Sequence, residues 1–144
     1  MANGPDRDYT GARTERRNLA YRLVAKHHQA GSNSQNAQWA KELTDDEEFA
    51  VFNFADTNEL EQVLGGDMVG LSPMQVRRIA VIGSKGEQIA YFPQSQFPNP
   101  WHGFPIDLRD HRKLTVADFV LSKLVVLNLI TPVQAGRLRK GKSA

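Results

Sequence analysis

The clearest helical pattern in the chain lies near its C-terminal end. Ala117, Leu121 and Leu124 recur at helical spacing, and further apolar residues flank them on the other faces. A helix that is apolar on every side is typical of a position in the middle of a core. The pattern therefore predicts a central apolar helix over about 116–129, with Thr115 as its N-cap.

Two polar signals mark the starts of other helices. Thr44 is followed three residues later by Glu47, which is the spacing of a capping box. Thr131 stands directly before Pro132, and proline is favoured at the first position of a helix. These signals predict one helix after Thr44 and a last, short helix over about 132–140.

Three further helices are expected in the N-terminal half. Thr10 or Thr14 can cap a first, arginine-rich helix that runs to about Ala30, where a glycine follows. Shorter helices are expected at about 34–43 and 56–64, each next to a glycine-containing break.

The middle of the chain changes from helical to strand-like patterns. Runs rich in β-formers at 78–82 and 88–92 flank the turn sequence at 83–86, which predicts one β-hairpin over about 78–92. A short edge strand at 106–108 can extend it. An isolated hairpin is only marginally stable, so these strands must pack on helices.

Together the elements predict an α+β fold dominated by helices. We expect a single globular domain over 10–144 after a flexible polar tail at 1–9, and 144 residues is an ordinary length for one domain. The chain has no cysteine, which excludes disulfides, thiolate metal sites and cysteine nucleophiles within it. No apolar run reaches the roughly 18–20 residues of a membrane span, and no secretory signal is visible. We therefore expect a cytoplasmic protein with no cofactor, no bound metal and no membrane contact.

Charge is distributed very unevenly along the chain, although the net charge is only +2. Counting Lys and Arg against Asp and Glu gives 7 − 3 = +4 for 1–41, 0 − 9 = −9 for 42–67 and 11 − 4 = +7 for 68–144. The acidic segment must face water, meet the chain's own basic segments or meet a basic partner. Its four successive carboxylates are candidate partner-binding residues: Asp45, Asp46, Glu47 and Glu48.

Residues 93–113 combine four prolines with aromatic side chains. Proline is excluded from helix interiors, and the rings argue against a simple linker. We expect an ordered loop in which Trp101, His102 and Phe104 either take a flat ligand or an extended segment of a partner, or anchor the loop by burial. The leading hypothesis is accordingly a non-catalytic accessory protein that binds another protein through its charged surfaces and this loop.

Nucleic acid is the alternative partner. The first predicted helix is basic, and the last one ends in a basic tail that can contact phosphates. The candidate residues are Arg13, Arg16, Arg17, Arg137, Arg139, Lys140 and Lys142.

An enzyme is the third hypothesis. His102, Asp107, Asp110 and His111 bring imidazoles and carboxylates into one stretch, and these groups can bind a metal or transfer protons. The spacing matches no established metal motif, and all four side chains converge only if the chain bends. The three residues weighed for catalysis are His102, Asp107 and His111; the sequence leaves the oligomeric state open.

Overall fold

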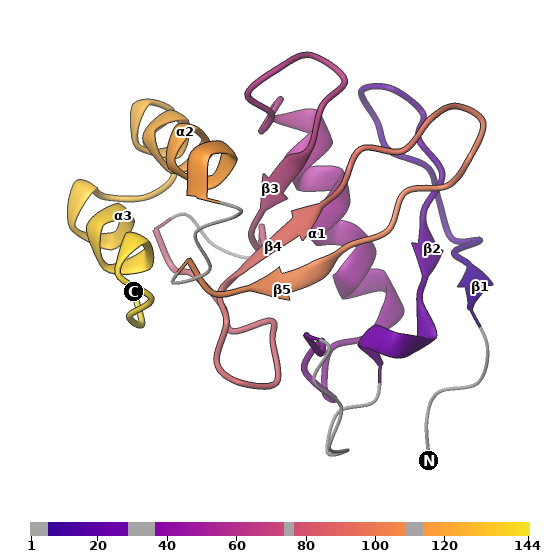
Figure 1. The fold of residues 1–144 in the computed structure, drawn as a ribbon, viewed down its shortest axis with the longest axis horizontal. Coiled ribbons are helices and arrows are strands. Elements are labelled where there is room, and N and C mark those ends of the chain that lie inside the picture. Colours follow the sequence, from indigo (N-terminus) through magenta and orange to yellow (C-terminus); the bar gives the residue numbers. More distant parts are fainter. Residues whose placement is uncertain (1–5, 29–36, 74–76, 109–113) are drawn as a thin grey trace.

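The computed structural model describes residues 6–28, 37–73, 77–108 and 114–144 (Figure 1). Three α-helices and two small antiparallel sheets make up an α+β domain, so the predicted class is confirmed. The helices are α1 (Asp45–Thr57), α2 (Leu114–Val126) and α3 (Pro132–Arg139), and a 3-10 turn, η1, covers Ala25–His27. Within those ranges, no helix has the length and apolar character that a bilayer crossing requires.

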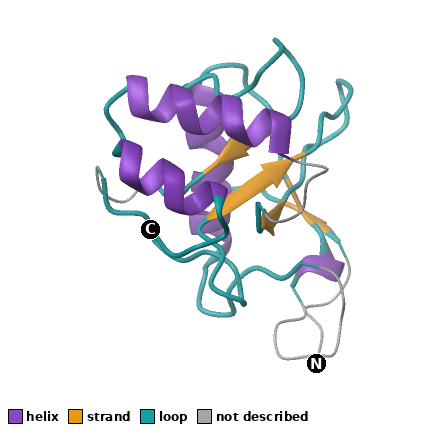
Figure 2. Cartoon of the chain, turned by 60° about the vertical axis from the view of Figure 1, so that its left-hand side comes forward, coloured by secondary structure: helices purple, strands orange, loops and turns teal. Residues whose placement is uncertain are grey.

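The main sheet contains β3 (Met68–Gly70), β4 (Ile89–Phe92) and β5 (Phe104–Ile106), in that order. Every residue of the central strand β4 is buried. Helix α1 lies behind the sheet in Figure 1 and approaches it closely at Gly70, where a Cβ would come within 2.8 Å of the Val51 carbonyl oxygen. Helices α2 and α3 pack side by side at one end of the sheet, as Figure 2 shows.

The predicted hairpin over 78–92 is only half right. The strand at its second half exists as β4, but β4 pairs with β3 and β5, and residues 78–82 form no strand. The N–H groups of Ile82 and Gly83 donate to the Glu87 carbonyl and close a tight turn instead. The outer strand β5 lies at 104–106, two residues before the predicted 106–108, and Pro105 is tolerated there because β5 is an edge strand.

The predicted first helix is wrong. Over the described part of 10–30, the chain forms a loop and then β2 (Arg22–Leu23), which pairs with β1 (Arg7–Asp8). The Thr14 hydroxyl accepts the Leu19 N–H, and such local side-chain bonds compete with helix formation. Residues 1–5 of the predicted tail at 1–9 lie outside the described residues. Its remaining residues, 6–9, include the strand β1.

The shorter N-terminal helices are also corrected. Residues 37–43 hold turns and the isolated bridge of Trp39 with Gly83, and the rest of that prediction, 34–36, lies outside the described residues. Beyond Thr57 the chain turns, with Glu59 at a φ of 54°, so no helix extends to residue 64. The described residues therefore contain fewer helices than expected.

Helix α2 buries the face that its spacing predicted, with Ala117, Leu121 and Leu124 against the core. It is nevertheless a surface helix, because Val126 on the opposite side is 83% exposed. Its first residue is Leu114, so Thr115 lies inside the helix instead of capping it.

Both predicted caps of the other helices are confirmed. The Thr44 hydroxyl accepts the Glu47 N–H while the Glu47 carboxylate accepts the Thr44 N–H, and Thr131 and Gln134 form the same reciprocal pair at α3.

Candidate functional site

The arginines of the N-terminal loop face the end of α1. The Arg17 guanidinium donates to Asp56 at 2.6 Å, and Arg16 lies 3.1 Å from the same carboxylate and also donates to Glu61. Asp56 is completely buried. Two guanidinium groups therefore neutralise a buried carboxylate, and these two candidates for phosphate contact are occupied within the molecule. Arg13 is exposed and donates to the Asn18 carbonyl.

Trp101 belongs to the same cluster. Its ring lies under the Arg17 guanidinium, 5.6 Å from ring centroid to Cζ, and the side chain is almost fully buried. Its backbone bonds to Ala20 and Arg22 fix the proline-rich loop against β2. Burial thus anchors the loop at Trp101, which is the second of the two roles weighed from the sequence.

The acidic segment is mostly paired inside the molecule. Asp45 forms an ion pair with Arg7 at 2.7 Å, Asp46 accepts the Tyr9 hydroxyl at 2.5 Å, and Glu47 serves the α1 cap. With Glu48, Asp56, Glu59, Glu61 and Asp67, eight of the nine carboxylates have a partner. Asp45, Asp56, Glu59 and Glu61 thus meet the chain's own arginines, while Asp46, Glu47 and Asp67 accept from neutral donors.

A buried polar chain connects Tyr21, Glu48 and His28. Glu48 is 1% exposed; it accepts the Tyr21 hydroxyl through Oε2, and its Oε1 lies 2.8 Å from His28 Nε2. Glu48 Oε1 and His28 Nε2 are both buried, and neither has a well-directed hydrogen bond among the described residues. Burial raises the pKa of Glu48, an effect that His28 and Tyr21 partly offset, and burial with the nearby Glu48 raises the pKa of Tyr21 well above its usual value.

A second group near the start of β5 contains His27, Phe104 and His102. The His27 ring stacks on Phe104 with 5.1 Å between centroids, and its Nδ1 lies 2.7 Å from the Ala37 carbonyl oxygen. Burial lowers the pKa of His27 and of His102, so both imidazoles favour the neutral form. His102 and Phe104 are half-buried.

The residues weighed for catalysis do not come together. His102 precedes β5 and Asp107 follows it, so an extended strand separates them by roughly 3.3 Å per residue. His102 faces Lys26, Asp6 and Arg22, whereas Asp107 lines a pocket elsewhere; His111 and Asp110 lie outside the described residues. No group of three or more histidines and carboxylates could hold a metal among the residues that the structure places.

The basic side chains near the C-terminal end have a different environment. Arg139 pairs with Asp118 at 2.5 Å, but Arg137 donates to the Ser143 carbonyl. Lys140 and Lys142 are exposed, and neither has a carboxylate within ion-pair distance in the described part of the chain. This is where the predicted basic tail keeps its positive charge unpaired.

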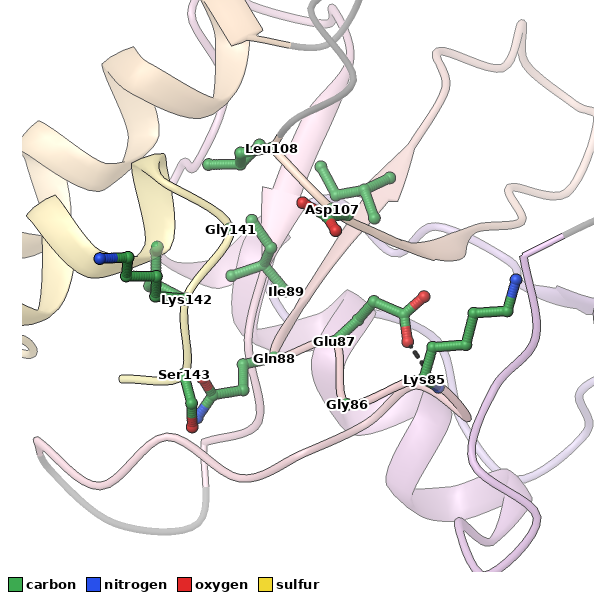
Figure 3. A pocket seen from close by; sticks show the side chains of 12 residues that line it. Lys85, Gly86, Glu87, Gln88, Ile89, Asp107, Leu108, Gly141, Lys142 and Ser143 are labelled. Atoms are coloured by element: carbon green, nitrogen blue, oxygen red, sulfur yellow. Dashed lines mark hydrogen bonds between the residues drawn. The ribbon is translucent and has the colours of Figure 1, made fainter.

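A small pocket of about 90 Å³ lies beside this tail (Figure 3). Ile89, Ile106 and Leu138 supply apolar walls, and the carboxylate of Asp107 lies among them. Lys85 and Lys142 stand on opposite sides of the pocket in Figure 3. Glu87 also lines the pocket, so its two lysines are matched by two carboxylates. We call this the Asp107 pocket.

One further surface carries exposed apolar side chains. On α2 these are Phe119, Val126 and, just beyond it, Leu127, and on α3 the residue is Val133. The Arg139–Asp118 pair and the bond from Arg139 to Ser122 show that the two helices run antiparallel, which brings Val133 to the end of α2. We call these four residues the α2–α3 face.

Comparison of the chain with protein-family models, curated proteins and solved structures finds no match.

The sequence did not reveal the Asp107 pocket or the α2–α3 face. The pocket joins a turn, two strands and a tail that are distant in sequence, so no local motif announces it. A signal for the face existed: the apolar residues around all sides of α2 are as consistent with an exposed docking surface as with a central position.

Proposed function

We propose that the chain is a non-catalytic binding protein and that the α2–α3 face docks an acidic partner protein. The observation that carries this proposal is the exposure of Val126 and Val133, at 83% and 72%, at one end of an antiparallel helix pair. Large apolar side chains that adjoin one another on a surface are typical of protein contacts.

Charge beside the face favours an acidic partner. Val133 and Arg137 on α3 and Lys140 at its C-cap follow one another at spacings of four and three, and all three are exposed. The exposed side of α3 thus begins apolar and ends cationic. A partner with an apolar patch bordered by carboxylates complements both parts.

The Pro/aromatic loop offers a second contact point in this proposal. Phe97 is 91% exposed, whereas Trp101 is buried. Hydrogen bonds from the Ser95 hydroxyl to the Asn99 and Pro100 carbonyls order the loop around it. An exposed ring on an ordered loop costs little conformational entropy on binding.

Site-specific photo-crosslinking tests the proposal. A benzophenone amino acid replaces Val126 in one variant and the exposed Glu42 in a control, and both are irradiated in the cell that naturally makes the chain. We expect one acidic protein attached at position 126 and absent at position 42. Equal products at both positions, no product, or attachment only of a second copy would contradict the proposal.

The purified partner then allows a matched test of charge. Val126→Asp adds a negative charge to the face and Val126→Lys adds a positive one, while both remove the same apolar contact. We expect Val126→Asp to weaken binding at least about tenfold more than Val126→Lys does, because the partner is acidic. Equal loss in both variants would show that charge does not select the partner.

A further inference from the structure

Arg77 lies against the joint between α2 and α3. Its backbone N–H donates to the Leu129 carbonyl at 2.9 Å, and its own carbonyl accepts the Gln134 side-chain amide at 2.7 Å. Its guanidinium donates through Nη2 to the side-chain oxygen of Asn128. Both the backbone and the side chain of Arg77 are therefore tied to the residues where one helix ends and the next begins.

These contacts place Arg77 beside the apolar end of the α2–α3 face. Asn128 directly follows Leu127, and Gln134 directly follows Val133. Leu127 and Val133 are 44% and 72% exposed, and Arg77 is exposed as well. A cation thus borders the apolar residues at the end of the face where α2 stops and α3 begins.

The backbone conformation of Arg77 is unusual for an arginine. Its φ is 62°, in the left-handed region that residues with a Cβ rarely adopt. Asn128 also has a φ of 62°, although asparagine tolerates this region better and is often found there just after a helix. The bonds to the α2–α3 joint hold the backbone of Arg77 in this conformation and so fix where its side chain leaves the surface. Backbone strain of this kind is concentrated at binding sites.

The guanidinium of Arg77 keeps donors for a ligand. A guanidinium carries five N–H groups in a planar fork, and the contact with Asn128 engages only Nη2. No carboxylate forms an ion pair with Arg77 among the residues that the structure describes, whereas Arg16 and Arg17 both direct their donors to Asp56. The other N–H groups of Arg77 can donate to a carboxylate, which is the acceptor that gives the strongest hydrogen bonds with arginine.

We propose that Arg77 selects the partner of the α2–α3 face by donating to a side-chain carboxylate that adjoins the partner's apolar contact. This inference rests on the proposed function and specifies the partner's chemistry, which is an Asp or Glu next to an aliphatic or aromatic side chain. The apolar group covers Leu127 and Val133, and the carboxylate meets the fork of Arg77. Exclusion of water by the apolar contact strengthens the charged contact beside it.

A library of random peptides displayed on phage supplies the probe. The library is first passed over the immobilised Val126→Asp variant, which removes peptides that bind elsewhere on the chain, and is then selected on the original chain. We expect the enriched peptides to carry Asp or Glu beside a large apolar residue. If no peptide is enriched, or if the enriched peptides lack a carboxylate, the proposal is wrong.

A double-mutant cycle then tests the contact itself. The tightest peptide is synthesised with its carboxylate and with the corresponding amide, and fluorescence anisotropy gives the affinity of each for the original chain and for Arg77→Ala. We expect the amide to bind the original chain about tenfold more weakly than the carboxylate does, and the two peptides to bind Arg77→Ala within roughly twofold of each other. An equal loss on both proteins would place the carboxylate on another cation and overturn the proposal.

Two further variants serve as controls. Arg77→Lys keeps the positive charge but loses the planar fork, so it should recover only part of the affinity that Arg77→Ala loses. Arg13→Ala removes an exposed cation of the N-terminal loop and should leave the affinity of the peptide unchanged. If Arg13→Ala weakens binding as much as Arg77→Ala does, the attraction is general and the proposal fails. Circular dichroism of each variant checks that the fold is retained.

The results separate this inference from the proposed function. If photo-crosslinking at Val126 captures an acidic protein but the cycle shows no coupling at Arg77, the docking function stands and the role of Arg77 is overturned. If the cycle shows coupling but no protein is crosslinked in the cell, the carboxylate contact is supported and the proposed function fails.

Discussion

The two ends of the chain use basic residues in opposite ways. In the N-terminal part, Arg7, Arg16 and Arg17 each face carboxylates of α1 or the loop after it. In the C-terminal part, Lys123 and Arg137 donate to backbone carbonyls. The N-terminal arginines are therefore held in ion pairs, whereas Lys140 and Lys142 at the other end have no ion pair among the described residues.

The difference follows from where the carboxylates fall. The segment at 42–67 carries nine acidic residues, and β1, β2 and the loop between them pack against it. The segment at 68–144 carries only four, of which Asp118 forms an ion pair with Arg139. The charge of each segment thus indicates better than the net charge of +2 whether its basic residues find carboxylates within the fold.

The largest effect is expected where this comparison is most extreme, at Asp56. Asp56→Ala leaves the guanidinium groups of Arg16 and Arg17 partly buried without their shared carboxylate. Breaking a buried pair in this way should lower the free energy of unfolding by about 3–5 kcal/mol. Urea denaturation followed by circular dichroism measures it.

The control for Asp56 is Glu59→Ala. Glu59 lies 3.7 Å from Arg16 but its side chain is 61% exposed, so its loss should cost no more than about 1 kcal/mol. Equal losses for the two variants would show that burial of the cluster contributes nothing.

A second prediction uses the pH dependence of Glu48. Burial raises the folded-state pKa of Glu48 above its ordinary value of 4.5, so the folded chain keeps a proton that the unfolded chain releases. This contribution is present below about pH 4.5 and is lost as the pH rises through the raised pKa. The stability difference between the original chain and Glu48→Gln should therefore fall with rising pH, by at most about 1.4 kcal/mol per pH unit.

The groups around Glu48 set the controls for that measurement. Tyr21 and His28 contact its carboxylate, and Asp45 and Arg7 act on it through space. Tyr21→Phe keeps the ring but removes the hydroxyl, and it should leave the sign of the pH dependence unchanged. A pH-independent difference for Glu48→Gln, or the same slope for exposed Glu42→Gln, contradicts the assignment.

Local signals in the sequence predicted local structure well. The capping boxes at Thr44 and Thr131 are formed, and the α+β class and the buried face of α2 are as expected. These features depend on residues three or four apart, so the sequence contains all their partners. The strand at 89–92 was predictable for the same reason.

Long-range pairing was not predictable from those signals. β4 does not pair with the run next to it at 78–82. It pairs on one edge with β3, about 20 residues away, and on the other edge with β5, about 15 residues away. The arginines at 16 and 17 fit a helix pattern, yet their ion pairs with Asp56 hold the loop. The acidic and basic segments were correctly identified, but which of them neutralise each other is a property of the fold.

A third prediction compares the two caps, which are alike at both ends of the molecule. Thr44→Ala and Thr131→Ala each remove one hydroxyl that accepts the N3 N–H of its helix. Each should cost about 1 kcal/mol of unfolding free energy. Thr44→Ser and Thr131→Ser retain the acceptor and should recover most of that loss. A difference of several kcal/mol between the two alanine variants would mean that one cap also supports tertiary contacts.

The smallest effect is expected at the ion pair between Arg139 and Asp118. Both side chains are substantially exposed, so Asp118→Ala should lower the free energy of unfolding by only about 0.2–1 kcal/mol. The same variant leaves the Arg139 guanidinium without its carboxylate partner. Asp118→Asn, which removes the charge but keeps a hydrogen-bond acceptor, should cost less stability than Asp118→Ala. If Asp118→Ala instead destabilises the chain as much as Asp56→Ala, the C-terminal cations are structural too, and the contrast between the two ends disappears.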